Sequence, residues 1–529
     1  MWRRNRCERG RWQVSEILAD QSAPSVDLGR RVAQRAEVRM LIDGLLVESA
    51  SGERFDNVSP ATGLLLGSTT AAGPADMDRA IGAARRAFDD SDWSTDVELR
   101  KRCLQQLQSA LEAEQEDLRE ELIAEVGCPA MTTQSAQLDW PLAAALRYPT
   151  GLIDEFAWER TLDGGGLFGD RNVRTVVKEP AGVVAAITPS NFPIEVILNK
   201  LGPALATGNT VVLKPDPNTP WNATRLGRLI AEHTDIPAGV VNVVPTPSND
   251  VAARLGADPR VDLISFTGST AVGRALMRQA ADTMKRTFLE LGGKSALVVL
   301  DDANPAAIIP SAVGVCVHAG QACASTTRML VHRSLFDEAV AGVTTVFANV
   351  PVGDPVHADT LVGPLISAAQ RQKVLDACDQ ARGSGAEITT GGAAYGKSEG
   401  LAEHLLDGHF VQPTVIVGVD NSAPIARQEI FGPVLVIMPF DDDDDAVRLA
   451  NDNPFGLAGA VLSRSTERAM SVARRIRTGA VGVNGGMYYG ADAPFGGYKN
   501  SGVGRQCGIE GFEQYLETKT IGVRMPRRK

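Results

Sequence analysis

The sequence contains no hydrophobic run long enough to cross a membrane. Apolar stretches such as residues 183–187 and 296–300 fall far short of the roughly 20 residues that a spanning helix needs. An excess of basic charge is also lacking, since the formal net charge is −11. Nucleic acids and anionic membranes are bound by clustered Lys and Arg. We therefore expect neither a membrane partner nor a nucleic-acid partner.

Histidine and cysteine are too few and too scattered to suggest a metal site or a disulfide framework. The six histidines include no H-x-x-x-H pair, and the seven cysteines include no C-x-x-C pair. The run of five Asp at 441–445 precedes a helical pattern, where carboxylates favour the positive end of the helix dipole. We therefore expect no metal and a reducing, cytoplasmic-type compartment. The chemistry must then depend on Cys, Glu, Asn and Lys.

The first 39 residues differ in composition from the rest of the chain. They carry nine Arg against five acidic residues. They contain no apolar stretch of the kind found in a secretory signal, and their acidic residues argue against a transit peptide. We expect a disordered leader over residues 1–39, with the folded chain beginning at Met40.

From Met40 onward the hydrophobic pattern is regular. Short strands are predicted at 40–47 and 55–58, and amphipathic helices at 75–88 and 97–126. Strands and helices then alternate: the strands are 183–187, 210–213, 240–244 and 263–266, and the helices are 194–207, 219–233, 251–255 and 271–281. A second series runs from 295 to about 485. This alternation predicts an α/β fold with two lobes, each a parallel sheet covered by helices.

Two glycine-rich segments could be phosphate-binding loops. Residues 164–169 satisfy G-x-G-x-x-G, but a strand pattern at 174–178 follows them, whereas the motif has meaning only between a strand and a helix. Residues 265–274 do lie between a predicted strand and a helix. There, Gly268 would let the backbone approach a pyrophosphate and Gly273 would allow close helix–sheet packing. A purely structural glycine turn is the alternative.

Cys323 is the candidate nucleophile. It follows Gly-Gln-Ala, so small neighbours leave its sulfur accessible. A lone cysteine is more often a small buried apolar residue, which is what we expect of Cys316. Cys323 differs because two other segments offer matching groups. Glu290 precedes a double glycine, and Asn191 follows a predicted strand, the position at which such folds bind ligands.

These segments, together with Lys214-Pro215, 428–433 and 494–502, resemble the aldehyde dehydrogenase superfamily over residues 40–525. The resemblance implies two Rossmann-like lobes and a small β element for oligomerisation. The implied boundaries are 40–157 and 179–291 for the cofactor-binding domain, 292–490 for the catalytic domain, and 158–178 and 505–529 for the oligomerisation strands. A homodimer or homotetramer is expected, because the patterns at 173–178 and 518–525 predict exposed strands that need a partner.

The resemblance also implies a mechanism. The Cys323 thiolate would attack an aldehyde carbon to give a thiohemiacetal, with the Asn191 amide and the Cys323 N–H binding the oxyanion. Loss of hydride to a nicotinamide cofactor would leave a thioester, which water activated by Glu290 would hydrolyse to the acid. Glu429 and Phe431 would contact the nicotinamide ribose, Lys214 the adenosine ribose and Ser269 the pyrophosphate. The implied cofactor-binding residues are Thr188, Pro189, Ser190, Lys214, Gly268, Ser269, Gly273, Leu291, Gly292, Glu429 and Phe431.

The sequence departs from the family pattern in two places: after Lys214, and in the implied substrate tunnel, where Glu195 and Asn199 replace the bulky apolar side chains that members often have. Pro217 replaces a Glu that in many members binds the ribose hydroxyls, so no carboxylate there repels a 2′-phosphate. The cofactor is therefore NAD or NADP, and we expect NADP to be at least partly tolerated. The implied substrate tunnel combines aromatic and polar residues, which fits a medium-sized aldehyde better than a dicarboxylic semialdehyde. Its candidate residues are Phe192, Glu195, Asn199, Tyr488, Tyr489 and Phe495. The alternative for Glu195 is a solvent-facing or ion-paired carboxylate.

Three other functions are compatible with a reactive cysteine. A CoA-acylating aldehyde dehydrogenase would use the same thiol but usually lacks the hydrolytic Glu, which is present here as Glu290. A cysteine hydrolase needs a histidine beside the thiol, and the nearest in sequence, His318, lies in an apolar segment that predicts a helix interior. An inactivated structural relative is disfavoured because Cys323, Glu290 and Asn191 are all intact.

Overall fold

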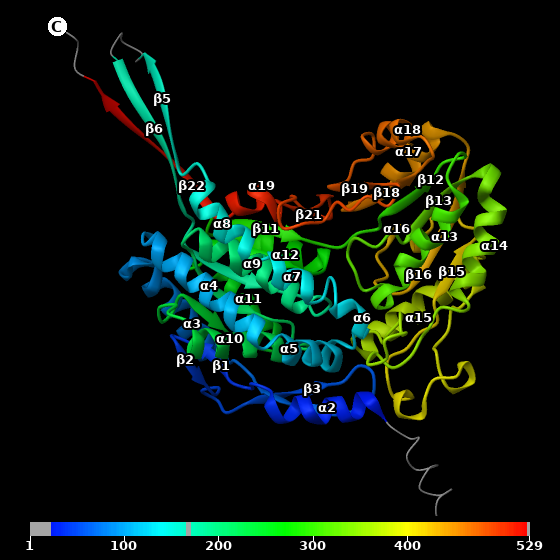
Figure 1. Ribbon diagram of the computed structural model, residues 1–529, viewed down its shortest axis with the longest axis horizontal. Helices are drawn as coiled ribbons and strands as arrows, with labels where there is room; N and C mark the ends of the chain where they lie inside the picture. Colours follow the sequence, from blue (N-terminus) through cyan, green and yellow to red (C-terminus); the bar gives the residue numbers. More distant parts are fainter. Residues whose placement is uncertain (1–22, 166–170, 526–529) are drawn as a thin grey trace, which may run out of the picture.

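The computed structural model describes residues 23–165 and 171–525, which form two α/β lobes side by side and a projecting β arm (Figure 1). The predicted fold class, with two parallel-sheet lobes, is confirmed. No helix in these two ranges is both long and apolar enough to cross a bilayer.

The first lobe contains an eight-stranded sheet in the order β2-β1-β9-β8-β7-β10-β11-β21. Its strands are β1 (Met40–Ile42), β2 (Leu45–Val47), β7 (Val183–Ile187), β8 (Thr210–Lys214), β9 (Val241–Val243), β10 (Leu263–Thr267), β11 (Arg286–Glu290) and β21 (Gly502–Val503). The strands β9, β8, β7, β10 and β11 are parallel. The chain fills one side of β7 with β8 and β9, and the other side with β10 and β11. The strand order therefore reverses between β7 and β10, and ligands bind at the carboxyl ends of strands at such a point.

Helices cover both faces of this sheet because successive side chains of the buried strands point to opposite faces. Val183 and Ala185 pack in one core cluster with α3 (Pro74–Asp90), α11 (Asn249–Ala257) and α12 (Thr270–Ala281). Val184 and Ala186 pack in another. That second cluster includes α4 (Val97–Ala113), α8 (Arg147–Glu155), α9 (Pro193–Ala206) and α10 (Trp221–His233). The helix predicted over 97–126 is divided into α4, α5 (Gln115–Glu121) and a π-helical turn, Leu122–Val126.

The second lobe has a seven-stranded sheet in the order β14-β15-β16-β13-β12-β18-β19, antiparallel only at β14. Its strands are β12 (Ala296–Val299), β13 (Arg328–His332), β14 (Glu387–Thr390), β15 (Thr414–Val417), β16 (Val434–Phe440), β18 (Ala458–Leu462) and β19 (Ala480–Val483). Its main helices are α13 (Pro305–Val313), α14 (Phe336–Phe347), α15 (Ala368–Gly383), α17 (Asp443–Asn451) and α18 (Thr466–Ala473). The Asp run starts α17 as predicted, because the Asp442 side chain accepts a hydrogen bond from the Asp445 N–H. No cluster suited to a metal ion occurs among the described residues.

The remaining elements connect or flank the two sheets. Two of them form a hairpin, β3 (Arg54–Val58) and β4 (Leu65–Thr70), and another short pair is β17 (Phe455–Gly456) with β20 (Tyr498–Lys499). The short helices are α6 (Ala130–Thr133), α7 (Asp139–Ala144), α16 (Pro424–Arg427) and α19 (Gly508–Glu513).

The projecting arm is an antiparallel sheet of β5 (Glu159–Gly165), β6 (Arg171–Pro180) and β22 (Leu516–Arg524) (Figure 1). The G-x-G-x-x-G motif at 164–169 lies between β5 and β6, two antiparallel strands, and residues 166–170 lie outside the described ranges. The motif is therefore not the loop of a β–helix unit. The predicted strand segment 505–529 is wrong in its first part, because 508–513 forms α19 and Phe512 is buried in the core of the first lobe.

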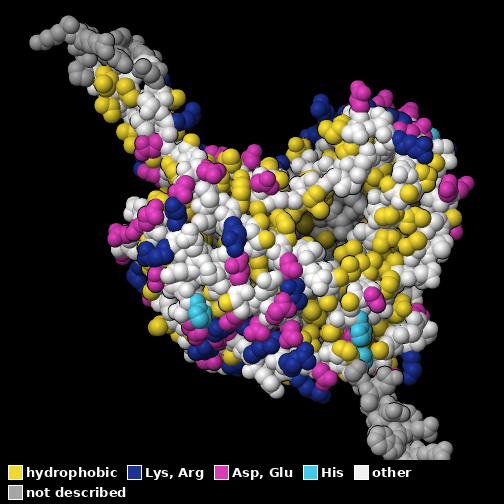
Figure 2. Space-filling view, in the orientation of Figure 1, with side chains coloured by type: hydrophobic (Ala, Val, Ile, Leu, Met, Phe, Trp, Pro, Cys, Tyr) yellow, Lys and Arg dark blue, Asp and Glu magenta, His cyan; other side chains and the backbone are white. Residues whose placement is uncertain are grey.

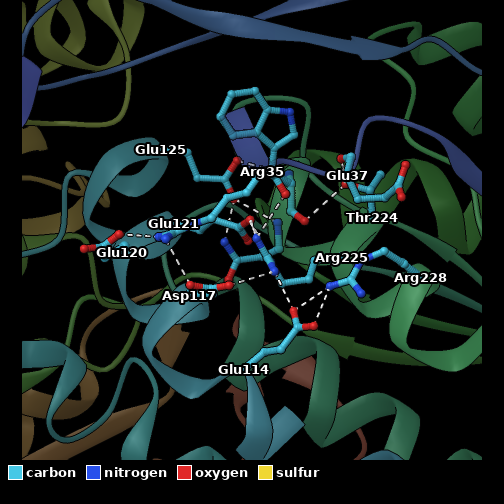
Figure 3. A network of polar contacts seen from close by, with 12 residues as sticks. Arg35, Glu37, Glu114, Asp117, Glu120, Glu121, Glu125, Thr224, Arg225 and Arg228 are labelled. Atoms are coloured by element: carbon cyan, nitrogen blue, oxygen red, sulfur yellow. Dashed lines mark hydrogen bonds and ion pairs between the residues drawn. The ribbon is translucent and has the colours of Figure 1, made fainter. Parts of the chain in front are cut away.

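The prediction of a disordered leader is wrong for residues 24–39; residues 1–22 lie outside the described ranges. Helix α2 (Pro24–Arg35) buries Leu28 and Val32 in the core of the first lobe. Arg35, the last residue of α2, forms ion pairs with Asp117 and Glu120 (Figure 3). Next to them, Arg225 is buried and forms an ion pair with Glu121 of α5. Burial of two apolar side chains one helical turn apart, with ion pairs at the helix end, fixes this segment to the lobe.

Candidate active site

Asn191 lies where the two lobes meet. It follows β7 in a turn that ends at Pro193, the first residue of α9. Its side-chain amide donates to the backbone carbonyl of Gln321 in the second lobe, at 2.7 Å. Its own backbone carbonyl accepts from the Gln137 amide at 2.8 Å and lies 3.0 Å from Nε2 of His318. These contacts fix the position of the Asn191 amide, because its partner Gln321 lies two residues before Cys323 in the sequence.

Cys323 lies in the turn that precedes β13 and is half-buried. Burial raises the pKa of its thiol, and the nearby carboxyls of Glu290 and Glu429 act in the same direction. The thiol is therefore protonated at rest. Packing requires a glycine at position 293, because a methyl group on Gly293 would lie 2.6 Å from the carbonyl oxygen of Cys323. This close approach brings the 290–295 segment against the cysteine turn.

Glu290 is the last residue of β11, and its carboxyl group is buried. Both carboxyl oxygens lack a hydrogen-bond partner within the described residues. Burial raises the pKa of Glu290 well above its ordinary value, while Lys200 and Arg505 act to lower it. An unpaired buried carboxyl of raised pKa beside a cysteine is typical of a proton-transferring group.

Lys200 is a residue of this site that the sequence analysis missed. It lies on α9 with its Nζ 3.1 Å from Oγ of Ser265 and 4.9 Å from the centre of the Phe288 ring. Burial lowers the pKa of Lys200 to about 7, and Glu290 and Glu195 act to raise it. Its signal in the sequence is a single Lys inside the otherwise mostly apolar run 194–206.

The carboxyl ends of β7 and β10 lie where the strand order of the first sheet reverses. Ser269 caps α12 there, accepting a hydrogen bond from the Val272 N–H at 3.3 Å, and the start of such a helix is suited to an anion. Gly273 permits close packing, because a methyl group there would lie 2.7 Å from Cδ2 of Leu291. Across from them lie Thr188, Pro189 and Ser190, which follow β7.

Glu429 reaches from the second lobe to the glycines that follow β11. Its carboxylate accepts a hydrogen bond from the Gly293 N–H at 3.1 Å, and a methyl group on Gly292 would lie 2.0 Å from its other oxygen. Phe431 has a positive φ of 59°, which turns the chain beside it. Lys214 ends β8 and is half-buried, and burial lowers its pKa.

Pro217, three residues after Lys214, has no carboxylate that could bind the ribose hydroxyls. Asp216, the adjacent acid, accepts hydrogen bonds from both the backbone and the side-chain nitrogens of Asn218, at 2.9 and 2.8 Å. Its Oδ1 is therefore engaged in a local turn.

Four of the six predicted tunnel residues, Glu195, Asn199, Tyr489 and Phe495, contact one another. Glu195 accepts hydrogen bonds from the Tyr489 hydroxyl and, at 2.6 Å, from the Asn199 amide. The Tyr489 ring packs on Phe495, with centroids 4.9 Å apart, and on Trp140. Of the other two predicted residues, Phe192 packs on His318. Burial raises the pKa of the Tyr488 hydroxyl to about 12. The alternative for Glu195 is wrong, because the residue is buried and is bound by neutral donors.

The aromatic group adjoins an open cavity. Figure 2 shows a hollow between the two lobes. A separate cavity of about 580 Å³ lies against α7 and α8 of the first lobe and is lined by Trp140, Arg147, Tyr148, Glu155 and Asp492, among others. Trp140 belongs both to this cavity and to the ring stack that reaches Tyr489. Trp140 therefore separates this cavity from the buried groups around Tyr489.

The histidine that a cysteine hydrolase would need is engaged elsewhere. Nε2 of His318 faces the carbonyl of Asn191, and Nδ1 is buried with no partner within the described residues. Burial lowers the pKa of His318 to about 4. The predicted helix interior is also wrong here, because His318 and Ala319 both have a φ of 52° and interrupt the 3₁₀ turn Gly314–Gly320.

Comparison with known proteins identifies the family. The model of the "Aldehyde dehydrogenase family" matches residues 46–521. The chain is 41% identical to 3-succinoylsemialdehyde-pyridine dehydrogenase of Pseudomonas sp over 482 residues, which cover 91% of this chain and 97% of the relative. It is 36% identical to peroxisomal aminoaldehyde dehydrogenase 1 of Pisum sativum, covering 91% and 95% of the two chains.

Solved structures give the same result. Betaine aldehyde dehydrogenase from Staphylococcus aureus, in complex with NAD+, is similar with a TM-score of 0.89 and 33% sequence identity, covering 96% of this chain and 98% of that one. The chain belongs to the aldehyde dehydrogenase family. It is an oxidoreductase that acts on the aldehyde group.

Proposed function

We propose that this enzyme oxidises a medium-sized aldehyde to the carboxylic acid with NAD or NADP, using Cys323 as the nucleophile. The observation that carries the proposal is the convergence of three groups from different segments. The Asn191 amide donates a hydrogen bond to the carbonyl of Gln321, two residues before Cys323. The unpaired Glu290 carboxyl lies close enough to the Cys323 thiol to raise its pKa.

The residues at the carboxyl ends of the first sheet suit a nicotinamide dinucleotide. This assignment rests on the helix start at Ser269, on the side-chain-free backbone at Gly268 and Gly292, and on the Glu429 carboxylate, which bonds to the Gly293 N–H. Thr188, Pro189, Ser190, Lys214, Gly273, Leu291 and Phe431 would complete its binding site. When bound, the dinucleotide supplies the hydride acceptor.

The side chains of this chain would perform the remaining steps. Ionised Glu290 takes the proton of the Cys323 thiol and passes it to solvent. The sulfur then forms a bond to the carbonyl carbon as the C=O π electrons move to oxygen, and the negative oxygen accepts hydrogen bonds from the second N–H of the Asn191 amide and from the Cys323 N–H. After hydride loss the acyl group remains on sulfur as a thioester. Ionised Glu290 takes a proton from water, whose oxygen attacks the acyl carbon, and the acid leaves as the C–S bond breaks. Hydrolysis, rather than transfer to CoA, is supported by the presence of Glu290.

We also propose that the arm mediates a homodimer or homotetramer. Its strand β22 is exposed along nearly its whole length, with Ile521 and Val523 open to solvent.

Six cysteines are free in the described residues, and a catalytic thiol must stay reduced. These features support a reducing, cytoplasmic compartment.

The test is an aldehyde panel run with NAD and with NADP, followed by absorbance of the reduced nicotinamide and by chromatography of the acid in the absence of CoA. Cys323→Ala should abolish turnover while dinucleotide binding persists. Cys378→Ala, a matched change in the core of the second lobe, should retain turnover. Acid formation that requires CoA, or persists in Cys323→Ala, would contradict the proposal.

A further inference from the structure

Glu195 places a carboxyl group in a wall that is otherwise built of aromatic rings. It lies on α9, one helical turn beyond Asn191, and only 7% of its surface is exposed. Its neighbours Tyr489, Trp140 and Phe495 form a ring stack that extends to the open cavity. A carboxyl group buried among rings costs free energy unless it is paired, so its presence needs a reason.

Only half of this carboxyl group is satisfied by the protein. Oε1 accepts both hydrogen bonds, from Tyr489 and from Asn199. Oε2 accepts none within the described residues. It therefore keeps the capacity to accept a hydrogen bond from a ligand.

No protein cation neutralises Glu195 within the described part of the chain. Lys200 acts to lower the pKa of Glu195, but its Nζ is bonded to Ser265 and forms no ion pair with the carboxyl. Burial raises the pKa of Glu195 to about 7. A ligand cation beside Oε2 would return this carboxyl to its ionised form and would gain a charge-assisted hydrogen bond.

Resting on the proposed function, we propose that Glu195 is a specificity residue that binds a protonated nitrogen at the far end of the aldehyde. The substrate class is then an aldehyde that carries an ammonium group or a protonated nitrogen heterocycle. The carbonyl end lies at Cys323, whose thiol is within the electrostatic influence of Glu195.

The test compares paired substrates: ω-aminoaldehydes of three to five carbons, each matched with the alkanal in which a methyl group replaces the ammonium. The intact enzyme should prefer the amino member of at least one pair by kcat/KM. In Glu195→Gln that preference should fall roughly ten- to hundredfold, the loss of one hydrogen bond to a charged group, and the change should lie mainly in KM. Tyr489→Phe keeps the carboxylate, so its preference should remain within about threefold of the intact enzyme.

A binding measurement that needs no turnover separates this proposal from the proposed function. Propylammonium, titrated by calorimetry, should bind the intact protein and lose affinity in Glu195→Gln but not in Glu155→Gln, which removes a carboxylate at the outer cavity. Equal losses for both members of a pair, or propylammonium binding that is unchanged in Glu195→Gln, would overturn the assignment. Oxidation of alkanals in preference to every amino partner would also overturn it, and would leave the proposed function intact.

Discussion

The side-chain amide of Asn191 and the backbone carbonyl of Gln321, 2.7 Å apart, join the two lobes beside the reactive cysteine. One amide proton is used in this bond, and the other is available to an oxygen bonded to the carbon that Cys323 attacks. The contact therefore orients a donor in advance, which is how a protein stabilises developing negative charge.

Asn191→Ala should lower kcat by about 10²–10³-fold, the usual effect of removing one donor to an oxyanion. Steady-state kinetics measure the loss, and calorimetric titration with the dinucleotide should give an unchanged dissociation constant. A variant that keeps more than a tenth of the original kcat would contradict the role of the amide.

Glu290 predicts a pH dependence. A general base acts in its ionised form, and burial raises its pKa well above that of an ordinary carboxyl. Hydrolysis of the thioester should therefore increase as pH rises through the raised pKa, with Lys200, Arg505 and Glu195 as the charged groups that set it. In Glu290→Gln this limb should disappear, and a burst of one reduced nicotinamide per subunit should precede slow turnover. Rapid-mixing absorbance measures both, and a variant without a burst would argue against a hydrolytic role.

Pro217 predicts tolerance of a 2′-phosphate. In the intact enzyme kcat/KM for NAD should exceed that for NADP by less than a thousandfold. Pro217→Glu should reduce kcat/KM for NADP at least tenfold more than for NAD, because a carboxylate there repels the phosphate. Asn218→Glu, at the exposed neighbouring position, is the control for a general change of charge. An equal effect of both variants on the two cofactors would refute the explanation.

Leu28 predicts that helix α2 contributes to stability. Its side chain is 2% exposed, and Leu28→Ala should cost about 2–5 kcal/mol in the free energy of unfolding. Arg30→Ala, on the exposed face of the same helix, should change it by less than about 0.5 kcal/mol. Urea unfolding followed by circular dichroism compares the two, and equal stabilities would show that the helix is dispensable.

The arm predicts a loss of assembly when its exposed apolar residues become charged. Ile521→Lys combined with Val523→Lys should convert the oligomer to monomers, measured by sedimentation velocity. Glu517→Lys, near the base of the same strand, should leave assembly intact. Full assembly of the double variant would place the interface elsewhere.

The strands and helices of both lobes were largely predictable, because buried parallel strands are short apolar runs and their helices have a different period. The leader was not, since α2 becomes stable only through contacts of Leu28 and Val32 with distant residues. The same reason hid Lys200, whose surroundings come from β10 and β11. The bond between Glu195 and Tyr489 joins residues 294 positions apart, and no local pattern reports such a contact.

The last strand of the first sheet, β21, reaches β11 only after the chain has completed the second lobe. The first lobe is therefore not formed by one continuous stretch of the sequence. A fragment that stopped near residue 291 would carry a sheet with β11 as a bare edge, free to pair with other chains. Synthesis of the enzyme must accordingly reach its final residues before the earlier sheet can be closed.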